Sequence, residues 1–197
     1  MHLFALQPPE IIQAMYGLVN KAIEGLVRQE AGDAAWEEIK RKAGVNVDYF
    51  VSMNPYPDEI SYNLVGAASE VLQIPADEVL RLFGEYWILY TAREGYGHLL
   101  AMSGNNLKEF LMNLDNLHTQ VGLNFPQLLP PSFRCTEVAE NTLILDYFSE
   151  RAGLAPMVIG LLQGLGKMMK TSVEIQHTQH RTENGRPDQF VITYRQE

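Results

Sequence analysis

The sequence predicts an α+β fold, with an N-terminal helical bundle followed by a small antiparallel sheet. Apolar residues recur every three or four positions through most of the chain before Phe125, which is the spacing of amphipathic helices. Near the C-terminus, apolar and polar residues instead alternate on both sides of Asn184-Gly185, as in a β-hairpin. Helices that come first and strands that come last favour an α+β domain over alternating βα units.

The helical part is divided by capping residues and prolines. Asp33 and Asp58 are placed to act as helix N-caps, and Gly44 follows the end of a helix. Pro55 and Pro57 bracket a loop between two helices. The predicted helices cover Met15–Glu30, Ala34–Lys42, a segment beginning at Asp58, a segment after Pro75, Leu99–Met102 and Leu107–Val121.

The second part is predicted to contain a strand, a helix and the hairpin. Three prolines between Phe125 and Pro131 argue against regular structure there. A strand follows from Leu143 to Glu150, and a helix runs from Met157 to Lys170. This helix contains Gly160, Gly164 and Gly166, which would permit another element to approach closely.

Composition limits the classes of function. The 197 residues suit one domain, and we expect residues 1–14 to be a tail and residues 15–197 to form that domain. A net charge of −9 argues against a nucleic-acid partner. No apolar run approaches the roughly 20 residues of a membrane span. One cysteine and an N-terminus without signal-peptide features indicate a cytoplasmic protein.

One histidine lies on the apolar face of a predicted helix. His118 belongs to a stripe with the i, i+3, i+4 spacing, so its ring should point into the protein. The other members of the stripe are Leu107, Phe110, Leu111, Leu114, Leu117 and Val121. A buried imidazole needs a hydrogen-bond partner or a ligand. Its position alone leaves both readings open, a satisfied core residue and a metal ligand.

The predicted strand at Leu143–Glu150 brings polar groups together. Side chains alternate along a strand, so Tyr147, Ser149 and Arg151 should share one face. Two hydroxyl groups and a guanidinium fork in a line form a receptor for carboxylates or phosphates. A solvated strand edge that carries these residues by chance remains the alternative.

Taken together, these stretches resemble the haem nitric oxide/oxygen-binding (H-NOX) family, which includes bacterial stand-alone sensors and the haem domain of soluble guanylate cyclase. The motifs that carry the resemblance are Leu-Asp-x-Leu-His at Leu114–His118 and Tyr-x-Ser-x-Arg at Tyr147–Arg151. The similarity extends over nearly all of Met15 to Tyr194. It includes Met15–Ile23, Leu64–Ser69, Phe83-Gly84, Glu94–Tyr96, Pro131–Phe133 and Gly153-Leu154.

The resemblance implies haem b, buried between the helices and the sheet. His118 matches the family's proximal iron ligand, and Tyr147, Ser149 and Arg151 match the residues that bind the haem propionates. Pro131 matches a proline that presses on the porphyrin. The sequence contains no Cys-x-x-Cys-His, so the haem would not be attached covalently.

The distal side of the haem would decide which gas binds. Family members that hold dioxygen donate a hydrogen bond to it from a tyrosine, and Met157 stands at that position here. A thioether donates no hydrogen bond. Val19 should add a further apolar side chain to the wall of the distal pocket. We therefore expect a nitric oxide sensor, which could also bind carbon monoxide. Trp87 carries an indole donor at a distal position, so a dioxygen or general diatomic-gas protein is the alternative.

The resemblance also implies how the signal would leave this domain. The sequence has no kinase or cyclase motif, so we expect a partner in trans, either a histidine kinase or a cyclic-nucleotide or dinucleotide signalling enzyme. An enzyme is not expected, because Ser149 lies in no Gly-x-Ser-x-Gly elbow. A haem-free interaction module is a further alternative, although the intact His118 and polar triad argue against it.

Overall fold

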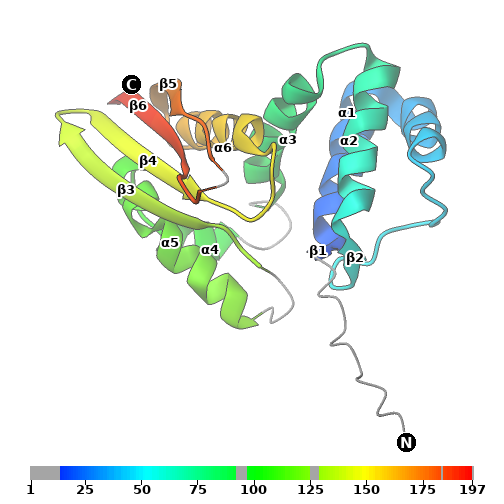
Figure 1. Cartoon of the computed structure of the whole chain (residues 1–197), viewed down its shortest axis with the longest axis horizontal. Coiled ribbons are helices and arrows are strands. Elements are labelled where there is room, and N and C mark those ends of the chain that lie inside the picture. The colour runs from blue at the N-terminus through cyan, green and yellow to red at the C-terminus, as the bar shows by residue number, and fades with distance from the viewer. Residues whose placement is uncertain (1–13, 92–96, 125–128, 183, 197) are drawn as a thin grey trace, which may run out of the picture.

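The computed structural model describes residues 14–91, 97–124, 129–182 and 184–196. Figure 1 shows two parts, with α1 and α2 side by side in one, and the sheet with α4, α5 and α6 in the other. Helix α3 lies between them. The helices are α1 (Gly17–Lys42), α2 (Asp58–Leu72), α3 (Ala76–Thr91), α4 (Gly97–Met102), α5 (Leu107–Asn124) and α6 (Ala155–Met168). The predicted α+β architecture is confirmed.

Helix α1 contains the two helices that the sequence predicts for residues 15–42. They meet at Gly32, whose backbone (φ 82°, ψ 175°) is not helical. A positive φ is strained for residues with a Cβ, so glycine suits this kink. Asp33 is the predicted N-cap of the second of these helices, and its carboxylate accepts a hydrogen bond from Arg28 of the first. The expected turn at Glu94–Gly97 lies largely outside the described residues.

Two clusters of buried apolar side chains stabilise the two parts. One cluster lies among α1, α2 and α3, with Trp36, Ile39 and Leu64 almost completely buried. The other lies between the sheet and helices α5 and α6 and includes Phe110 and Phe190. Each large buried side chain contributes roughly 1.5–3 kcal/mol through loss of apolar surface from water. Trp87 and Leu154 pack against both clusters and so connect the two parts.

The main sheet has four antiparallel strands in the order β3-β4-β6-β5. Its strands are β3 (Ser132–Ala139), β4 (Thr142–Phe148), β5 (Thr171–Gln179) and β6 (Asp188–Gln196). The predicted hairpin is present as β5 and β6. Strand β3 was not predicted, because only Phe133 and Cys135 in it point toward the core and the rest of this edge strand is exposed.

A second sheet consists of two short strands. Strand β1 (Ala14–Tyr16) pairs with β2 (Pro55–Pro57), where the sequence predicts a helix start and a loop. Proline tolerates this position because a two-stranded ribbon leaves one edge without ladder hydrogen bonds. No helix among the described residues is both long and apolar enough to cross a bilayer.

Helices α3 and α6 are in backbone contact, as the glycines in α6 lead one to expect. A Cβ placed on Gly160 would lie 1.9 Å from the Arg81 carbonyl oxygen. A Cβ on Gly84 of α3 would lie 2.1 Å from the Met157 carbonyl oxygen. Both positions therefore require glycine, and α3 is joined to α6 more tightly than to α1 or α2.

Candidate functional site

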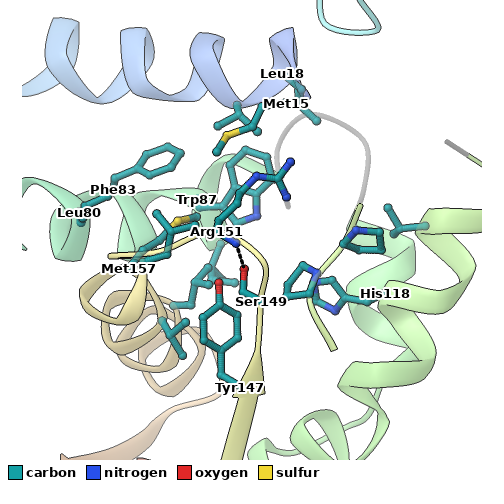
Figure 2. Close-up of a pocket in the computed structure, with 18 of the residues that line it drawn as sticks. Met15, Leu18, Leu80, Phe83, Trp87, His118, Tyr147, Ser149, Arg151 and Met157 are labelled. Atoms are coloured by element: carbon teal, nitrogen blue, oxygen red, sulfur yellow. Dashed lines mark hydrogen bonds between the residues drawn. The ribbon is translucent and has the colours of Figure 1, made fainter. Parts of the chain in front are cut away.

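A cavity of about 350 Å³ opens between the two parts of the molecule. This volume lies in the range of small-molecule and cofactor sites, roughly 300–1,000 Å³. Its wall is mainly apolar and takes residues from α1, α2, α3, α5, α6, β4 and the loops next to them. All eight residues singled out from the sequence line it: Val19, Trp87, His118, Pro131, Tyr147, Ser149, Arg151 and Met157. In Figure 2, His118 lies on one side of the cavity and Met157, Phe83 and Trp87 lie on the other.

His118 presents one ring nitrogen that is able to bind a metal. Its Nδ1 lies 2.9 Å from the Leu114 carbonyl oxygen, one turn earlier in α5. A carbonyl only accepts, so Nδ1 carries the proton and donates it, and the neutral imidazole keeps its lone pair on Nε2. Burial lowers the pKa of His118 below its usual 6.5, which favours this neutral form. The ring also packs on Phe133, with centroids 5.0 Å apart.

Asp115 connects the His118 helix to the start of β3. Its Oδ1 accepts hydrogen bonds from the Ser132 hydroxyl and the Phe133 N–H, both at 2.8 Å. These bonds, the backbone one first, lower the pKa of the Asp115 carboxyl. They restrain Pro131, the residue before Ser132, which lines the same cavity as His118. Sequence reasoning missed this role, although Asp115 belongs to the motif at Leu114–His118.

The polar end of the cavity is formed differently from the prediction. Strand β4 ends at Phe148, so Ser149 and Arg151 lie in the loop that follows it and are not on a strand face. Tyr147 is buried, which raises the pKa of its phenol, and its hydroxyl points toward the Ser149 side chain (Figure 2). The Ser149 hydroxyl oxygen in turn accepts the Arg151 N–H at 3.1 Å (Figure 2). The three residues do meet, but a turn brings them together.

Arg151 has an acidic partner that the sequence did not reveal. Its Nε lies 2.7 Å from Oδ2 of Asp58, and its Nη2 lies 3.3 Å from Oδ1. The predicted helix-capping role of Asp58 is wrong in this respect, because α2 has no side-chain cap and the carboxylate turns to Arg151. Nη1 and Nη2 also donate to the carbonyl oxygens of Leu129 and Ala14. Only three-dimensional proximity could reveal this pair, because 93 residues separate its members.

The wall far from His118 is apolar. Val19 of α1 and Met157 of α6 line it, together with Leu80 and Phe83 of α3. Trp87 packs edge-on against Phe83, with ring centroids 5.9 Å apart. The contact between α3 and α6 fixes Trp87 and Met157 relative to each other.

The arrangement defines a class of site. A flat apolar ligand with anionic groups would fit between the apolar wall and the donors at Tyr147, Ser149 and Arg151. His118 lines the same cavity, so its unprotonated ring nitrogen could bind a metal held within that ligand. A buried imidazole, anion receptor and apolar pocket in one cavity are the requirements of a haem-binding domain.

Comparison with known proteins agrees with this class. A family model described as Haem-NO-binding matches residues 16–177, so the chain belongs to that family, the H-NOX domains. Soluble guanylate cyclase gcy-31 of Caenorhabditis elegans is 30% identical over 163 residues, which are 82% of this chain and 23% of that protein. Soluble guanylate cyclase gcy-32 of the same organism is 34% identical over 156 residues. The chain spans about a quarter of the length of these relatives.

Solved structures share the fold. An H-NOX protein from S. oneidensis in the Fe(II)NO ligation state superposes with a TM-score of 0.82 at 19% identity, over 92% of this chain and 99% of that one. The Fe(II) form of a triple mutant from S. oneidensis gives a TM-score of 0.84 at 19% identity, over 93% of this chain and 97% of that one. The domains of this family bind haem, and the residues of the cavity fit that cofactor.

Proposed function

We propose that this chain binds haem b and senses nitric oxide, and that it passes the signal to a separate protein. The observation that carries the proposal is the tautomer of His118. Its Nδ1–H is bonded to the Leu114 carbonyl, so a neutral Nε2 is available to the cavity. Haem bound there would supply a ferrous iron that takes up diatomic gases.

The polar end of the cavity would bind the propionates. Tyr147 and Ser149 offer hydroxyl groups, and Arg151 offers a guanidinium that Asp58 holds in orientation. Charge-assisted hydrogen bonds from arginine to carboxylates are about twice as strong as neutral ones. Pro131, held through Asp115, would press against the face of the ring on the His118 side.

Selection among gases would follow from the apolar wall. Met157 and Val19 line the cavity and donate no hydrogen bonds. Bound dioxygen gains from a hydrogen bond because it is polarised, whereas nitric oxide and carbon monoxide need none. The pocket would therefore favour nitric oxide, with carbon monoxide as a second ligand. Dioxygen binding assisted by Trp87 is the alternative that an experiment must exclude.

The signal would leave through a change in how the two parts fit together. Arg151 links the loop after β4 to α2 and β1, through Asp58 and the Ala14 carbonyl. A gas that shifts His118 on α5 would act on the same cavity and bias these contacts. The expected receiver is a histidine kinase or a cyclic-nucleotide or dinucleotide signalling enzyme. The guanylate cyclase relatives support the second class, because their matching segments belong to cyclases.

The test is the visible spectrum of the purified, dithionite-reduced protein under argon, air, carbon monoxide and nitric oxide. We expect a five-coordinate ferrous spectrum that brief exposure to air leaves unchanged in form and that nitric oxide shifts. His118→Ala should lose haem, whereas His98→Ala, a change at an exposed histidine on α4, should not. A stable oxy spectrum would move the assignment to dioxygen, and a wild-type chain that takes up no haem would refute the proposal.

A further inference from the structure

A second group of metal-binding side chains lies at the end of the main sheet where Asp188 of β6 pairs with Tyr147 of β4. His177, His180 and Asp188 each offer one ligand atom, and these atoms all lie within 4.8 Å of one another. Among the described residues, it is the one group of three or more histidine, cysteine or acidic side chains that meets this geometry. It does not line the cavity described above.

The fold brings the two histidines together through an irregularity in β5. Residues three apart on a regular strand point to opposite faces. Here the register against β6 shifts between His177 and Gln179, where Phe190 and Gln189 are the partners. This bulge, followed by the end of the strand, turns His180 back toward His177, and their ring centroids are 4.2 Å apart. Bulges often re-aim side chains at functional sites.

The carboxylate is held in place beside them. Asp188 begins β6 and is buried, and its Oδ1 lies 2.8 Å from Nε2 of His177. The same oxygen accepts the Arg181 backbone N–H at 3.0 Å. The ring of His177 stacks on Phe190 with centroids 4.7 Å apart, so two of the three ligands are already oriented. His180 is exposed, which leaves a route from solvent.

We propose that His177, His180 and Asp188 bind one divalent transition-metal ion, with Zn²⁺ as the best match. Zinc binds imidazole nitrogen and carboxylate oxygen at about 2.0–2.2 Å and favours four tetrahedral ligands. Ligand atoms around such an ion lie roughly 3.3–3.5 Å apart, so His180 needs only a small side-chain rotation to reach it. The protein supplies three ligands, and water would complete the shell. Calcium and magnesium are poor candidates, because they prefer oxygen ligands.

The charges near the site are compatible with a bound cation. The ion would meet one carboxylate and two imidazoles in their neutral form. The side chain of Arg181, the residue after His180, does not bind Asp188, because its Nη1 donates to the Arg151 carbonyl oxygen at 2.7 Å. Through this bond the hairpin that holds the site is also tied to the loop that carries Ser149 and Arg151. A metal here would therefore stiffen the hairpin against the loop at the polar end of the cavity.

The test titrates ZnCl₂ into the haem-loaded full chain after removal of metals by a chelator and dialysis. Haem occupies His118, so calorimetry reports on the remaining sites. We expect one Zn²⁺ per chain, and binding weakened by about tenfold or more in His180→Ala. His98→Ala replaces an exposed histidine away from the site and should bind as the wild type does. MgCl₂ should give no comparable signal.

A second readout is thermal unfolding, because a metal that binds only the folded chain raises Tm. Zn²⁺ should raise the Tm of the wild type and of His98→Ala, but not that of His180→Ala. Equal zinc affinity in the wild type and in His180→Ala would overturn the proposal, as would a wild-type chain with no zinc bound. Neither result would bear on the gas-sensing proposal, since the spectrum of bound haem reports on that separately.

Discussion

Arg151 and Asp58 form a nearly buried ion pair that joins the two parts of the molecule. Nε of Arg151 lies 2.7 Å from Oδ2 of Asp58, and the two side chains are only 9% and 10% exposed. One residue follows β4 and the other begins α2. A change in how the helical part packs against the sheet would therefore alter this ion pair.

Asp58→Asn should destabilise the protein by about 3 kcal/mol, because it leaves the Arg151 guanidinium buried without its counter-charge. Urea unfolding of the haem-free chain measures this directly. Glu38→Gln is the matched control, because it removes the carboxylate of an exposed pair with Arg41 and should change little. Similar unfolding midpoints for the two variants would contradict a structural role for the pair. Haem should raise Tm more in Asp58→Asn than in the wild type, because the freed guanidinium can then bind a propionate fully.

Asp115→Asn should make the protein less stable at neutral pH and reduce its acid sensitivity. The folded state lowers the pKa of Asp115, so the carboxylate contributes stability above its usual 3.8. That contribution is lost as the pH falls from 3.8 through the lower folded value. The gap in unfolding free energy between wild type and variant should therefore narrow below about pH 3.8. If the difference in unfolding free energy stayed constant with pH, the hydrogen bonds of Asp115 would stabilise the fold independently of its charge.

Gly160→Ala should cost about 1–3 kcal/mol, because its Cβ would collide with the Arg81 carbonyl and force α3 and α6 apart. Gly66→Ala is the control within another helix. No atom outside the local helix lies within 4 Å of a Cβ at Gly66, so this change should be neutral or stabilising by up to about 1 kcal/mol. Chemical denaturation of both variants checks the pair of predictions. If Gly160→Ala and Gly66→Ala were equally stable, α3 and α6 would be able to move apart without a cost in unfolding free energy.

Met157→Tyr should give the haem-loaded protein a dioxygen complex that persists in air, because it adds a hydroxyl donor to the apolar wall. The oxy form is followed by its visible spectrum, and its dissociation rate by stopped flow. Met102→Tyr, at a side chain 80% exposed on α4, is the control and should behave as the wild type does. A variant that holds dioxygen no better than the wild type would show that Met157 does not face the gas.

Haem retention should fall only at a pH well below 6.5, the usual pKa of histidine, because burial lowers the pKa of His118 in the folded protein. Burial lowers the pKa of His118, so the neutral imidazole contributes stability that is fully present above 6.5. That stability is lost from 6.5 downward through the lower folded pKa, and a protonated ring cannot bind iron. Transfer of haem to an acceptor protein, measured from about pH 7.5 down to about pH 4, checks this. A pH-independent transfer rate would argue against His118 as the ligand.

Much of the fold could be predicted because its signals are local. Helical periodicity placed α1 to α6 to within a few residues, and alternation around Asn184-Gly185 gave the C-terminal hairpin. Strand β3 was missed because an exposed edge strand needs little apolar pattern. His118, Tyr147, Ser149 and Arg151 were singled out from local residue patterns. Val19, Trp87, Pro131 and Met157 were found through the family resemblance, and all eight residues line one cavity. Their roles toward haem remain predictions.

The sequence by itself determined the α+β class, the helix that carries His118, the hydroxyl and guanidinium groups after the motif strand, and the glycines between α3 and α6. These depend on residue type and spacing within one element. The tertiary structure alone decided that Asp58 pairs with Arg151, that Asp115 binds the backbone after Pro131, and that a bulge brings His177, His180 and Asp188 together. Such contacts depend on the packing of distant elements and on register shifts, and neither leaves a periodic signal in the chain.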